Sequence, residues 1–385
     1  MEIRKIAEEE IHQIKRLRDY AFRTPGGGGE EDFLFWMERA TRLGAFSDGK
    51  LSAQVMTYPL DVSFLGQKIK MGGVAYVATF PENRRSGFIR ALMTASLNEM
   101  KELGQLVSYL HPFDIPFYQK FGFDLVANEV SVSLKLKNLK RRSSGRGEIV
   151  RTSANQPDFS DVRAVYETYA TNHHGMLVRG DDWWGRLSRR GYTNEVALFR
   201  DEQNEPRGYL LYGFKGSEML VHELVALDFA AECELWAFIS SHDSMFETVQ
   251  ATHFGTPAEV ALALPNVTGL KMETEFNWMA RIVEVEAFLN AISFQTAEKV
   301  YVEIQNDVAD FNHGIFEIGD KIRRVESAPN DLLLQTDIGT FSQMMFGFMR
   351  PKELAYYGKM TASDKVLAIF EAAIPNVKPR FYDGF

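Results

Sequence analysis

An arginine-rich turn between an apolar segment and a long helical segment constrains this chain more than any other feature. The apolar segment, Gly73–Thr79, is typical of a buried strand. Arg84-Arg85-Ser86-Gly87 follows, and Phe88–Leu103 then carries apolar residues at helical spacing. A helix N-terminus presents unpaired N–H groups and the positive end of the helix dipole, and glycine permits close backbone approach. The turn therefore predicts an anion site with two arginines suited to a pyrophosphate, although a surface turn with solvated arginines would have the same residues.

The second half of the chain repeats this order of elements without the arginines. Strands are predicted over Glu195–Arg200, Gly208–Phe214 and Met219–Ala226, followed by a helix near Glu232–Ser241. Between them, Asp228-Phe229-Ala230-Ala231-Glu232 stands where the first half has its arginine turn, and it is acidic and lacks glycine. If the two halves are related units, we expect only the first to hold a polyphosphate.

The chain length and one aperiodic stretch predict the domain boundaries. A length of 385 residues suggests two or three domains. Lys135–Gly147 is basic and rich in Ser and Gly, so it is interpreted as a linker, with a nucleic-acid or lipid patch as the alternative. A third unit is predicted from Val285, with a strand at Val300–Ile304 and a helix at Asp364–Ala373. The predicted domains are residues 1–145, 146–284 and 285–385.

Composition limits the partners and the compartment. The chain has 52 Asp+Glu against 43 Lys+Arg, a net charge of -9, which argues against nucleic-acid binding over the whole surface and favours cationic small substrates. The first ten residues lack the apolar core of a signal peptide, and no segment approaches the roughly 18 apolar residues of a membrane span. We therefore expect a cytoplasmic protein with no membrane or nucleic-acid partner.

Cysteine and histidine usage argues against a metal or redox centre. Cys233 is the single cysteine, which excludes an intrachain disulfide and a Cys-rich zinc site, and its helical context favours a core position. His173-His174 has no third ligand at useful spacing, so no metal site is predicted.

Two motifs resemble the hallmarks of the GNAT acetyltransferases. The turn and the helix start match the pattern Arg/Gln-x-x-Gly-x-Gly/Ala, except that Ile89 stands at the last position. A bulky residue there is similar to the Eis-type (enhanced intracellular survival) N-acetyltransferases. Phe117–Phe123 resembles the second hallmark, aromatic-Tyr-x-Lys/Arg-x-Gly-aromatic. The resemblance implies an α+β fold of tandem GNAT-like mixed-sheet domains, the second degenerate, followed by an α/β sterol-carrier-like domain.

The same resemblance implies acetyl-CoA as co-substrate and no metal. Arg85, Ser86 and Gly87 would receive the pyrophosphate, and the backbone N–H of Val77 would hold the thioester carbonyl oxygen after the strand splays. Carried over by position, the family's acetyl-CoA contacts fall on Val77, Ala78, Thr79, Arg84, Arg85, Ser86, Gly87, Phe88, Ile89, Arg90, Phe113 and Asp114. For the last two residues a plain loop would have the same sequence.

The resemblance also assigns the acid and the base. Tyr118 is expected to be the general acid, because a phenol of ordinary pKa about 10 stays protonated at neutral pH and can donate to a thiolate. The alternative is one more aromatic residue in a packed cluster. Phe385 is expected to supply the base through its terminal carboxylate, as in Eis-type enzymes, with desolvation or a bridging water compensating for a low ordinary pKa. The alternative there is a frayed terminus.

The expected reaction is direct acetyl transfer, in a ternary complex, to a primary amine of a cationic small molecule (aminoglycoside-like or polyamine-like) or of a lysine. The glycine run Gly26–Gly29 is interpreted as a mobile loop, since a phosphate cradle would need a preceding strand and a following Gly-Lys-Ser/Thr. A helix is predicted over Asp32–Leu43. Residues with an acidic and aromatic mix suited to an ammonium would wall the acceptor pocket: Glu30, Glu31, Asp32, Phe33 and Trp36.

Two rival functions and the assembly state complete the expectations. One rival is an apolar-ligand carrier with a silent acetyltransferase domain, and the other is an aminoacyl-tRNA-dependent transferase, against which the intact arginine turn and the acidic charge both argue. The resemblance implies a homo-oligomer, a hexamer.

Overall fold

The structure is a computed structural model that describes residues 2–23, 29–140, 143–254, 256–264, 266–305 and 307–385. The chain forms two compact units. The first contains Met1–Ala127, Asn277–Pro379 and Asp383–Phe385, and the second contains Asn128–Phe276 and Arg380–Tyr382. Within the described ranges, no helix has the length and apolar character needed to cross a membrane.

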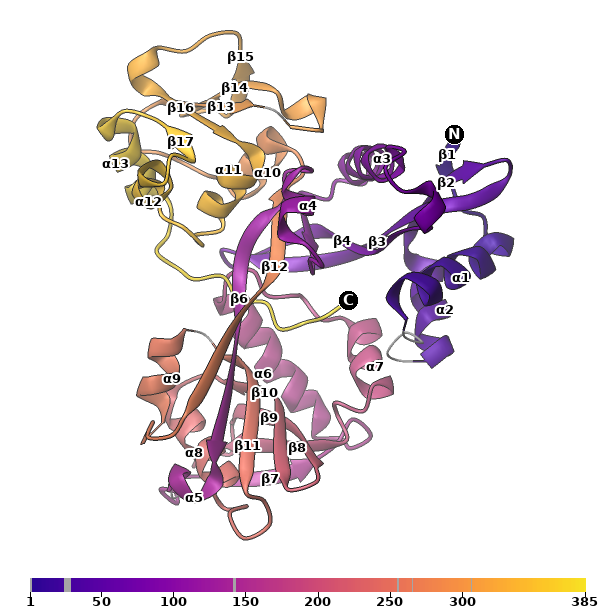
Figure 1. Cartoon of the computed structure of the whole chain (residues 1–385). Helices are drawn as coiled ribbons and strands as arrows, with labels where there is room; N and C mark the ends of the chain where they lie inside the picture. Colours follow the sequence, from indigo (N-terminus) through magenta and orange to yellow (C-terminus); the bar gives the residue numbers. More distant parts are fainter. Residues whose placement is uncertain (1, 24–28, 141–142, 255, 265, 306) are drawn as a thin grey trace. The chain divides into compact units, whose positions relative to one another are not determined.

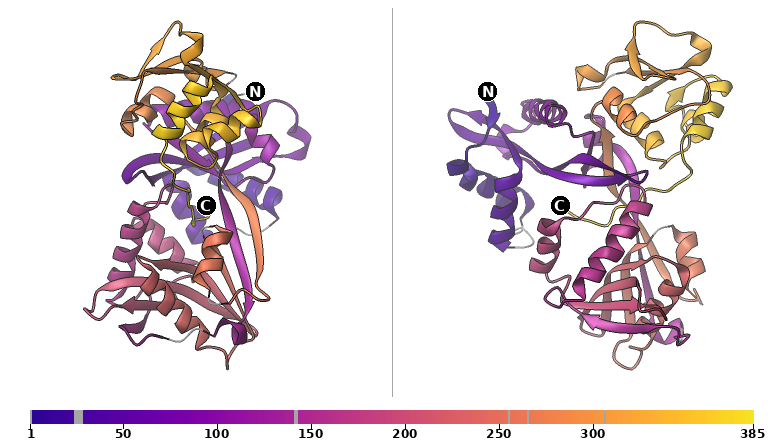
Figure 2. Two further views of the ribbon diagram at one scale, coloured as in Figure 1. Left: turned by 90° about the vertical axis from the view of Figure 1, so that its left-hand side faces the viewer. Right: turned by 180° about the vertical axis from the view of Figure 1, so that it is seen from behind.

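The N-terminal part of the first unit is a mixed sheet with helices on both faces. Its strand order is β1-β2-β3-β4-β5-β12, with β5 parallel to β4. Helices α1 and α2 cover one face and α3 covers the other (Figures 1 and 2). The elements are β1 (Glu2–Lys5), η1 (Glu8–Glu10), α1 (Ile11–Phe22), α2 (Gly29–Arg39), β2 (Thr41–Ser47), β3 (Lys50–Phe64), β4 (Gln67–Thr79), η2 (Pro81–Asn83), α3 (Phe88–Glu102), β5 (Val107–Leu110) and α4 (Ile115–Gln119), with β12 (Lys271–Ile282) from later in the chain.

The predicted buried strand Gly73–Thr79 is the end of the longer strand β4. Strands β3 and β4 form one long hairpin, in which Val62 and Phe64 continue the buried face of β3 up to the turn at Leu65-Gly66. Helix α2 covers Gly29–Arg39, whereas the predicted helix covered Asp32–Leu43. It starts three residues earlier than predicted because its three acidic residues suit the first turn of a helix. The other three glycines of the predicted loop lie outside the described residues.

The second unit has the same kind of architecture, as the repeated order of elements predicted. Its sheet runs β6-β11-β10-β9-β8-β7, and α6 and α8 pack on opposite faces of it (Figure 2). Each of these two helices has its own apolar cluster. Cys233 lies on α8 and is half-buried. The elements are β6 (Asp124–Lys135), α5 (Leu136–Leu139), β7 (Glu148–Thr152), α6 (Phe159–Asn172), α7 (Asp181–Arg189), β8 (Glu195–Arg200), β9 (Pro206–Lys215), β10 (Glu218–Ala226), α8 (Phe229–Ser240), β11 (Thr248–Phe254) and α9 (Pro257–Ala263).

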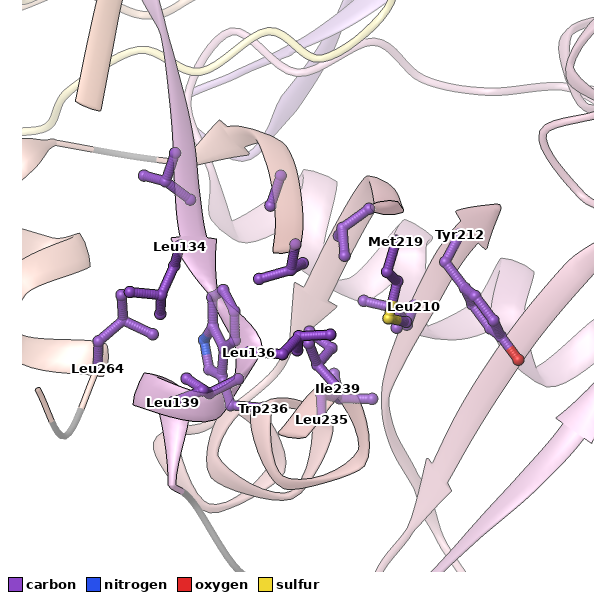
Figure 3. Close-up of a cluster of buried hydrophobic side chains, with 14 of the residues drawn as sticks. Leu134, Leu136, Leu139, Leu210, Tyr212, Met219, Leu235, Trp236, Ile239 and Leu264 are labelled. Carbon is purple, nitrogen blue, oxygen red and sulfur yellow. The ribbon is translucent and has the colours of Figure 1, made fainter. Parts of the chain in front are cut away.

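Two parts of the predicted linker pack on helix α8. Leu136 and Leu139 are buried against Trp236 and Leu235 of α8 (Figure 3). Ser144 donates two hydrogen bonds to Glu234, from its backbone N–H at 2.8 Å and from its hydroxyl at 2.6 Å. The basic residues around the two leucines led to the prediction of a linker. The burial of both leucines instead stabilises the short helix α5.

The C-terminal part of the first unit is a five-stranded sheet with helices and an irregular tail. The sheet order is β15-β14-β13-β16-β17. The strand predicted from Val300 and the helix predicted over Asp364–Ala373 are both present. The elements are α10 (Val285–Ala291), β13 (Val300–Gln305), η3 (Asp310–Asn312), β14 (Gly314–Ile318), β15 (Arg323–Val325), η4 (Asn330–Leu332), β16 (Leu333–Asp337), α11 (Ile338–Met345), α12 (Pro351–Tyr356), β17 (Met360–Thr361) and α13 (Asp364–Ala373).

Candidate active site

The predicted anion site is an open helix N-terminus. Gly87 caps α3 with a left-handed backbone (φ 79°), and an added Cβ there would meet open space. Arg84, Arg85 and Ser86 are exposed, and neither arginine forms an ion pair with any described residue. Phe88 is buried in the core and fixes the first turn of the helix. The arrangement leaves the N–H groups of this turn and two guanidinium groups available to an anion.

Strands β4 and β5 separate close to this helix start. Their parallel pairing extends only from Met71 and Val107 to Gly73 and Tyr109, while β4 continues to Thr79. Beyond Gly73, the β5 side of β4 therefore has no paired strand in the described part of the chain. Backbone groups on an unpaired strand side are available to a ligand, so this fork is a second binding feature.

A β-bulge in β4 re-aims the side chains at the fork. Ala75 pairs with Met56 and Ala78 with Gln54, so Tyr76 and Val77 together oppose Val55. Tyr76 has a left-handed backbone (φ 49°). Its ring faces α1 and α2, whereas Val77 joins the cluster that contains Phe88 and Tyr118. Bulges of this kind occur near active sites, where they redirect side chains.

The predicted acid Tyr118 is buried in an aromatic cluster at the end of the short helix α4. Phe113, Phe117 and Phe123 surround its ring at centroid distances of 5.5, 5.1 and 6.4 Å. Burial raises the pKa of the Tyr118 phenol. Its hydroxyl donates no hydrogen bond to a described residue, so the proton is available to a bound group. Val77, Phe88 and Ile89 pack in the same cluster, so the fold brings these predicted residues together with Tyr118.

Phe113 and Asp114, the last two predicted acetyl-CoA contacts, both interact with Phe117 of α4. The Asp114 carboxylate accepts a hydrogen bond from the Phe117 N–H at 2.7 Å and caps α4. Phe113 is exposed, and its ring lies against Phe117. Asp114 therefore supports the helix that carries Tyr118. Arg90 is exposed on the first turn of α3.

The C-terminal residue lies at the fork. A Cβ placed on Gly73 would come within 3.0 Å of the Phe385 ring, so glycine at this position leaves room for the terminal aromatic side chain. The same ring contacts Tyr58 at 6.2 Å and Trp278 at 5.8 Å between centroids. Phe385 thus packs beside the last residue at which β4 and β5 are paired.

The predicted acceptor residues fall into two groups. Trp36 and Phe33 are buried: Trp36 packs on Tyr58 at 5.2 Å, and the Arg18 guanidinium lies 4.0 Å from the Phe33 ring centroid. Asp32 is also buried, on the first turn of α2. The other two acids are exposed, and Glu30 forms an ion pair with Lys15 at 2.5 Å.

Three aromatic residues of this region were missed by sequence reasoning. Tyr58 and Trp278 flank Phe385, and Tyr76 contacts Phe33 at 6.1 Å. Tyr58 and Tyr76 lie in ordinary strand sequences, and Trp278 comes from a distant part of the chain, so no local pattern marked them. The ring of His111 packs against Trp278 at 5.4 Å between centroids.

No group of His, Cys, Asp and Glu among the described residues has the arrangement of a metal site.

Comparison with protein families finds three successive domains. Residues 2–126 and residues 175–282 each match the family description "Acetyltransferase (GNAT) domain". Residues 285–382 match "Sterol carrier protein domain". The tandem fold and the C-terminal domain expected from the sequence are thus confirmed.

Curated relatives align with most of the chain. An uncharacterized N-acetyltransferase from Streptomyces avermitilis is 25% identical and covers 94% of this chain and 92% of its own length. The N-acetyltransferase Eis from Mycobacterium tuberculosis is 24% identical and covers 79% of this chain and 78% of its own length.

Solved structures show the same fold over the whole chain. A probable N-acyltransferase from Enterococcus faecalis V583 superposes with a TM-score of 0.91 at 24% identity, covering 100% of this chain and 99% of that chain. Eis1 from Mycobacterium abscessus superposes with a TM-score of 0.82 at 19% identity, covering all of both chains.

Proposed function

Because the chain belongs to the Eis-type N-acetyltransferases of the GNAT superfamily, we propose that it transfers the acetyl group of acetyl-CoA directly to a primary amine of a cationic small molecule or a lysine. The observation that carries this proposal is the position of Phe385 beside Gly73, where β4 and β5 separate. From that position the terminal carboxylate of Phe385 would reach the fork where a thioester would lie.

The acetyl-CoA site proposed here uses the open start of α3. Arg84, Arg85 and the N–H groups of Ser86 and Gly87 would bind the pyrophosphate, because the turn is exposed and its arginines have no acidic partner among the described residues. The unpaired side of β4 would hold the pantetheine arm, with Ala78 and Thr79 beside it. Acetyl-CoA supplies the activated acetyl group.

We assign the chain's own residues three tasks: one stabilises an oxyanion, one donates a proton and one accepts a proton. The Val77 N–H would stabilise the oxyanion of the carbonyl under attack. Tyr118, kept neutral by burial, would donate its proton to the departing thiolate. The Phe385 carboxylate would accept one proton from the substrate ammonium, directly or through a water molecule, so that the neutral amine can attack the thioester carbonyl. The second nitrogen proton would be lost as the tetrahedral intermediate collapses to the amide, and it would restore the Tyr118 phenol.

The acceptor amine would lie beside the aromatic rings of α2, β3 and the chain terminus. Trp36, Tyr58 and Phe385 form a continuous row of ring contacts, which suits a cationic amine. Glu31 is the exposed acid of α2 that pairs with no cation among the described residues, so Glu31→Lys should raise the acceptor KM several-fold and leave the acetyl-CoA KM unchanged. An unchanged acceptor KM would remove Glu31 from the site.

The proposal is tested with a thiol-release assay that uses acetyl-CoA and a panel of amines. The assay is applied to the wild type and to two variants. Tyr118→Phe should lower kcat about 100-fold, since a positioned general acid contributes at least that much. The control is Tyr356→Phe, which removes a hydroxyl from an exposed tyrosine. Near-normal turnover in Tyr118→Phe would exclude the acid role, and no release of thiol with any amine would contradict the proposed function itself.

The second variant displaces the terminal carboxylate. Appending two glycines after Phe385 should abolish turnover with little change in acetyl-CoA affinity, because the base would no longer stand at the fork. The matched controls are the same residues added at the N-terminus and Phe385→Tyr, which keeps the carboxylate in place. A fully active extended enzyme would remove Phe385 from the mechanism.

The proposal also includes a cytoplasmic homo-oligomer, a hexamer by family resemblance, which light scattering of the purified chain would measure.

A further inference from the structure

A fully buried ion pair lies behind the helix that carries Tyr118. The side chains of Arg281 of β12 and Asp307 are both completely inaccessible, and the guanidinium binds the carboxylate through two hydrogen bonds, Nη1 to Oδ1 at 3.0 Å and Nη2 to Oδ2 at 2.7 Å. The same Nη1 donates to the backbone carbonyl of Phe121 at 2.5 Å. One guanidinium therefore joins residues from all three matched domains.

The carbonyl that Arg281 binds belongs to the turn that closes α4. The Phe121 N–H donates to the Tyr118 carbonyl at 2.9 Å, and the Gly122 N–H donates to the Gln119 carbonyl at 3.0 Å. Gly122 has a left-handed backbone (φ 76°), and a Cβ there would come within 2.7 Å of Arg281 Nη1. The turn therefore packs directly on the guanidinium, three residues from the phenol.

The carboxylate of the pair is itself fixed by the C-terminal domain. The side-chain amide of Asn312 donates to Asp307 Oδ2 at 2.9 Å, and the Ala309 N–H donates to Oδ1 at 3.2 Å. The Asn312 amide nitrogen also donates to the Val283 carbonyl at 2.8 Å. The pair is thus held in one orientation by bonds on every side.

We propose that Arg281 and Asp307 are positioning residues for Tyr118, so that the sterol-carrier-like domain fixes the general acid of the first domain. A buried ion pair is often replaceable by apolar residues without loss of stability, because desolvation offsets its attraction. Stability alone therefore does not account for a pair that also binds the turn of α4. A shift of about 1 Å in a catalytic group is enough to cost about 100-fold in rate.

The inference rests on the acid role proposed for Tyr118, and a mutant cycle separates the two. The double variant Arg281→Met/Asp307→Leu removes both charges together and releases the Phe121 carbonyl. We expect kcat to fall about 30-fold to 100-fold while both KM values stay within about twofold, since the substrates bind elsewhere. The triple variant, in which Tyr118→Phe is added to the double variant, should have the same kcat as Tyr118→Phe alone, because both changes act through the Tyr118 phenol.

The acyl donor supplies a second readout. A thioester of an acidic aryl thiol needs no proton on its leaving group. With that donor, the kcat of the double variant should therefore approach the kcat of the wild type. Losses that multiply with Tyr118→Phe, or a defect that is equal for both donors, would overturn the positioning role. Near-normal kcat in Tyr118→Phe with a defective double variant would instead contradict the acid assignment.

Folding is controlled with a conservative variant. Arg281→Lys keeps the charge but cannot bind both carboxylate oxygens and the Phe121 carbonyl at once. It should therefore lose less kcat than the double variant, and this loss should again disappear when Tyr118→Phe is also present. If the double variant does not fold, Arg281→Lys carries the test, and wild-type kcat in a folded Arg281→Lys enzyme would overturn the inference.

Discussion

Helices α3 and α8 begin at corresponding points of the two GNAT domains, yet their first turns present opposite charges. At α3, Gly87 provides no side-chain hydrogen bond, and the preceding arginines are exposed. At α8, the Asp228 carboxylate accepts a hydrogen bond from the Ala231 N–H at 2.9 Å and pairs with Arg207 at 2.6 Å. The second helix thus has its own anion where the first leaves its N–H groups open.

This difference in capping leaves the first turn of α3, but not that of α8, open to an external anion. Burial opposes ionisation of Asp228, but the bonds from the Ala231 N–H and from Arg207 outweigh it and lower the pKa of this carboxyl. A carboxylate that stays charged at the helix start would repel a phosphate and occupy its donors. This agrees with the expectation that only the first domain holds a polyphosphate.

The largest effect is expected when a carboxylate like that of Asp228 is placed at the start of α3. Gly87→Asp should raise the acetyl-CoA KM about 100-fold, because a carboxylate would then compete with the pyrophosphate at the helix start. Gly87→Asn is the matched control, since asparagine has nearly the same shape and tolerates the left-handed backbone. Steady-state kinetics in varied acetyl-CoA measure both, and equal KM values for the two variants would contradict an anion site at this turn.

A smaller effect is expected from removing the arginines. Arg84→Ala/Arg85→Ala should raise the acetyl-CoA KM about tenfold, since exposed charge-assisted contacts are partly screened by solvent. Acetyl-pantetheine lacks the pyrophosphate, so its KM should be the same for variant and wild type. A loss that is equal for both donors would mean that the arginines stabilise the fold of the turn instead of binding phosphate.

The smallest effect concerns stability in the second domain. Asp228→Ala should lower the free energy of unfolding by about 1 kcal/mol, the usual value for loss of an N-cap, and leave kcat unchanged. Asp228→Asn keeps a capping oxygen and should cost less. Denaturant unfolding measures both, and a fall in activity that exceeds the loss of folded protein would show that α8 takes part in catalysis.

The pH dependence of that effect has a definite sign. Because the folded state lowers the pKa of Asp228, the stabilisation is present above the ordinary aspartate pKa of about 3.9 and is lost as the pH falls through the lower folded pKa. The difference in unfolding free energy between wild type and Asp228→Asn should therefore be constant near neutral pH and shrink below about pH 4. A difference that grew on acidification would contradict the lowered pKa.

The sequence by itself determined several helices and strands and the two motifs. The spacing of apolar residues in Phe88–Leu103 and Asp364–Ala373 is local information, and so are the glycine that follows two arginines and the tyrosine in its aromatic run. These patterns act through backbone preference and side-chain periodicity within a few residues, so they can be recognised before folding.

Only the tertiary structure decided which distant residues meet. The bulge that turns Tyr76 toward Phe33 depends on pairing with β3, and the burial of Leu136 and Leu139 depends on α8. Phe385 reaches Gly73, and Arg281 reaches Phe121, across more than 150 residues of chain. The physical reason is that such contacts are selected by the packing of whole elements against one another, and no local propensity encodes that choice.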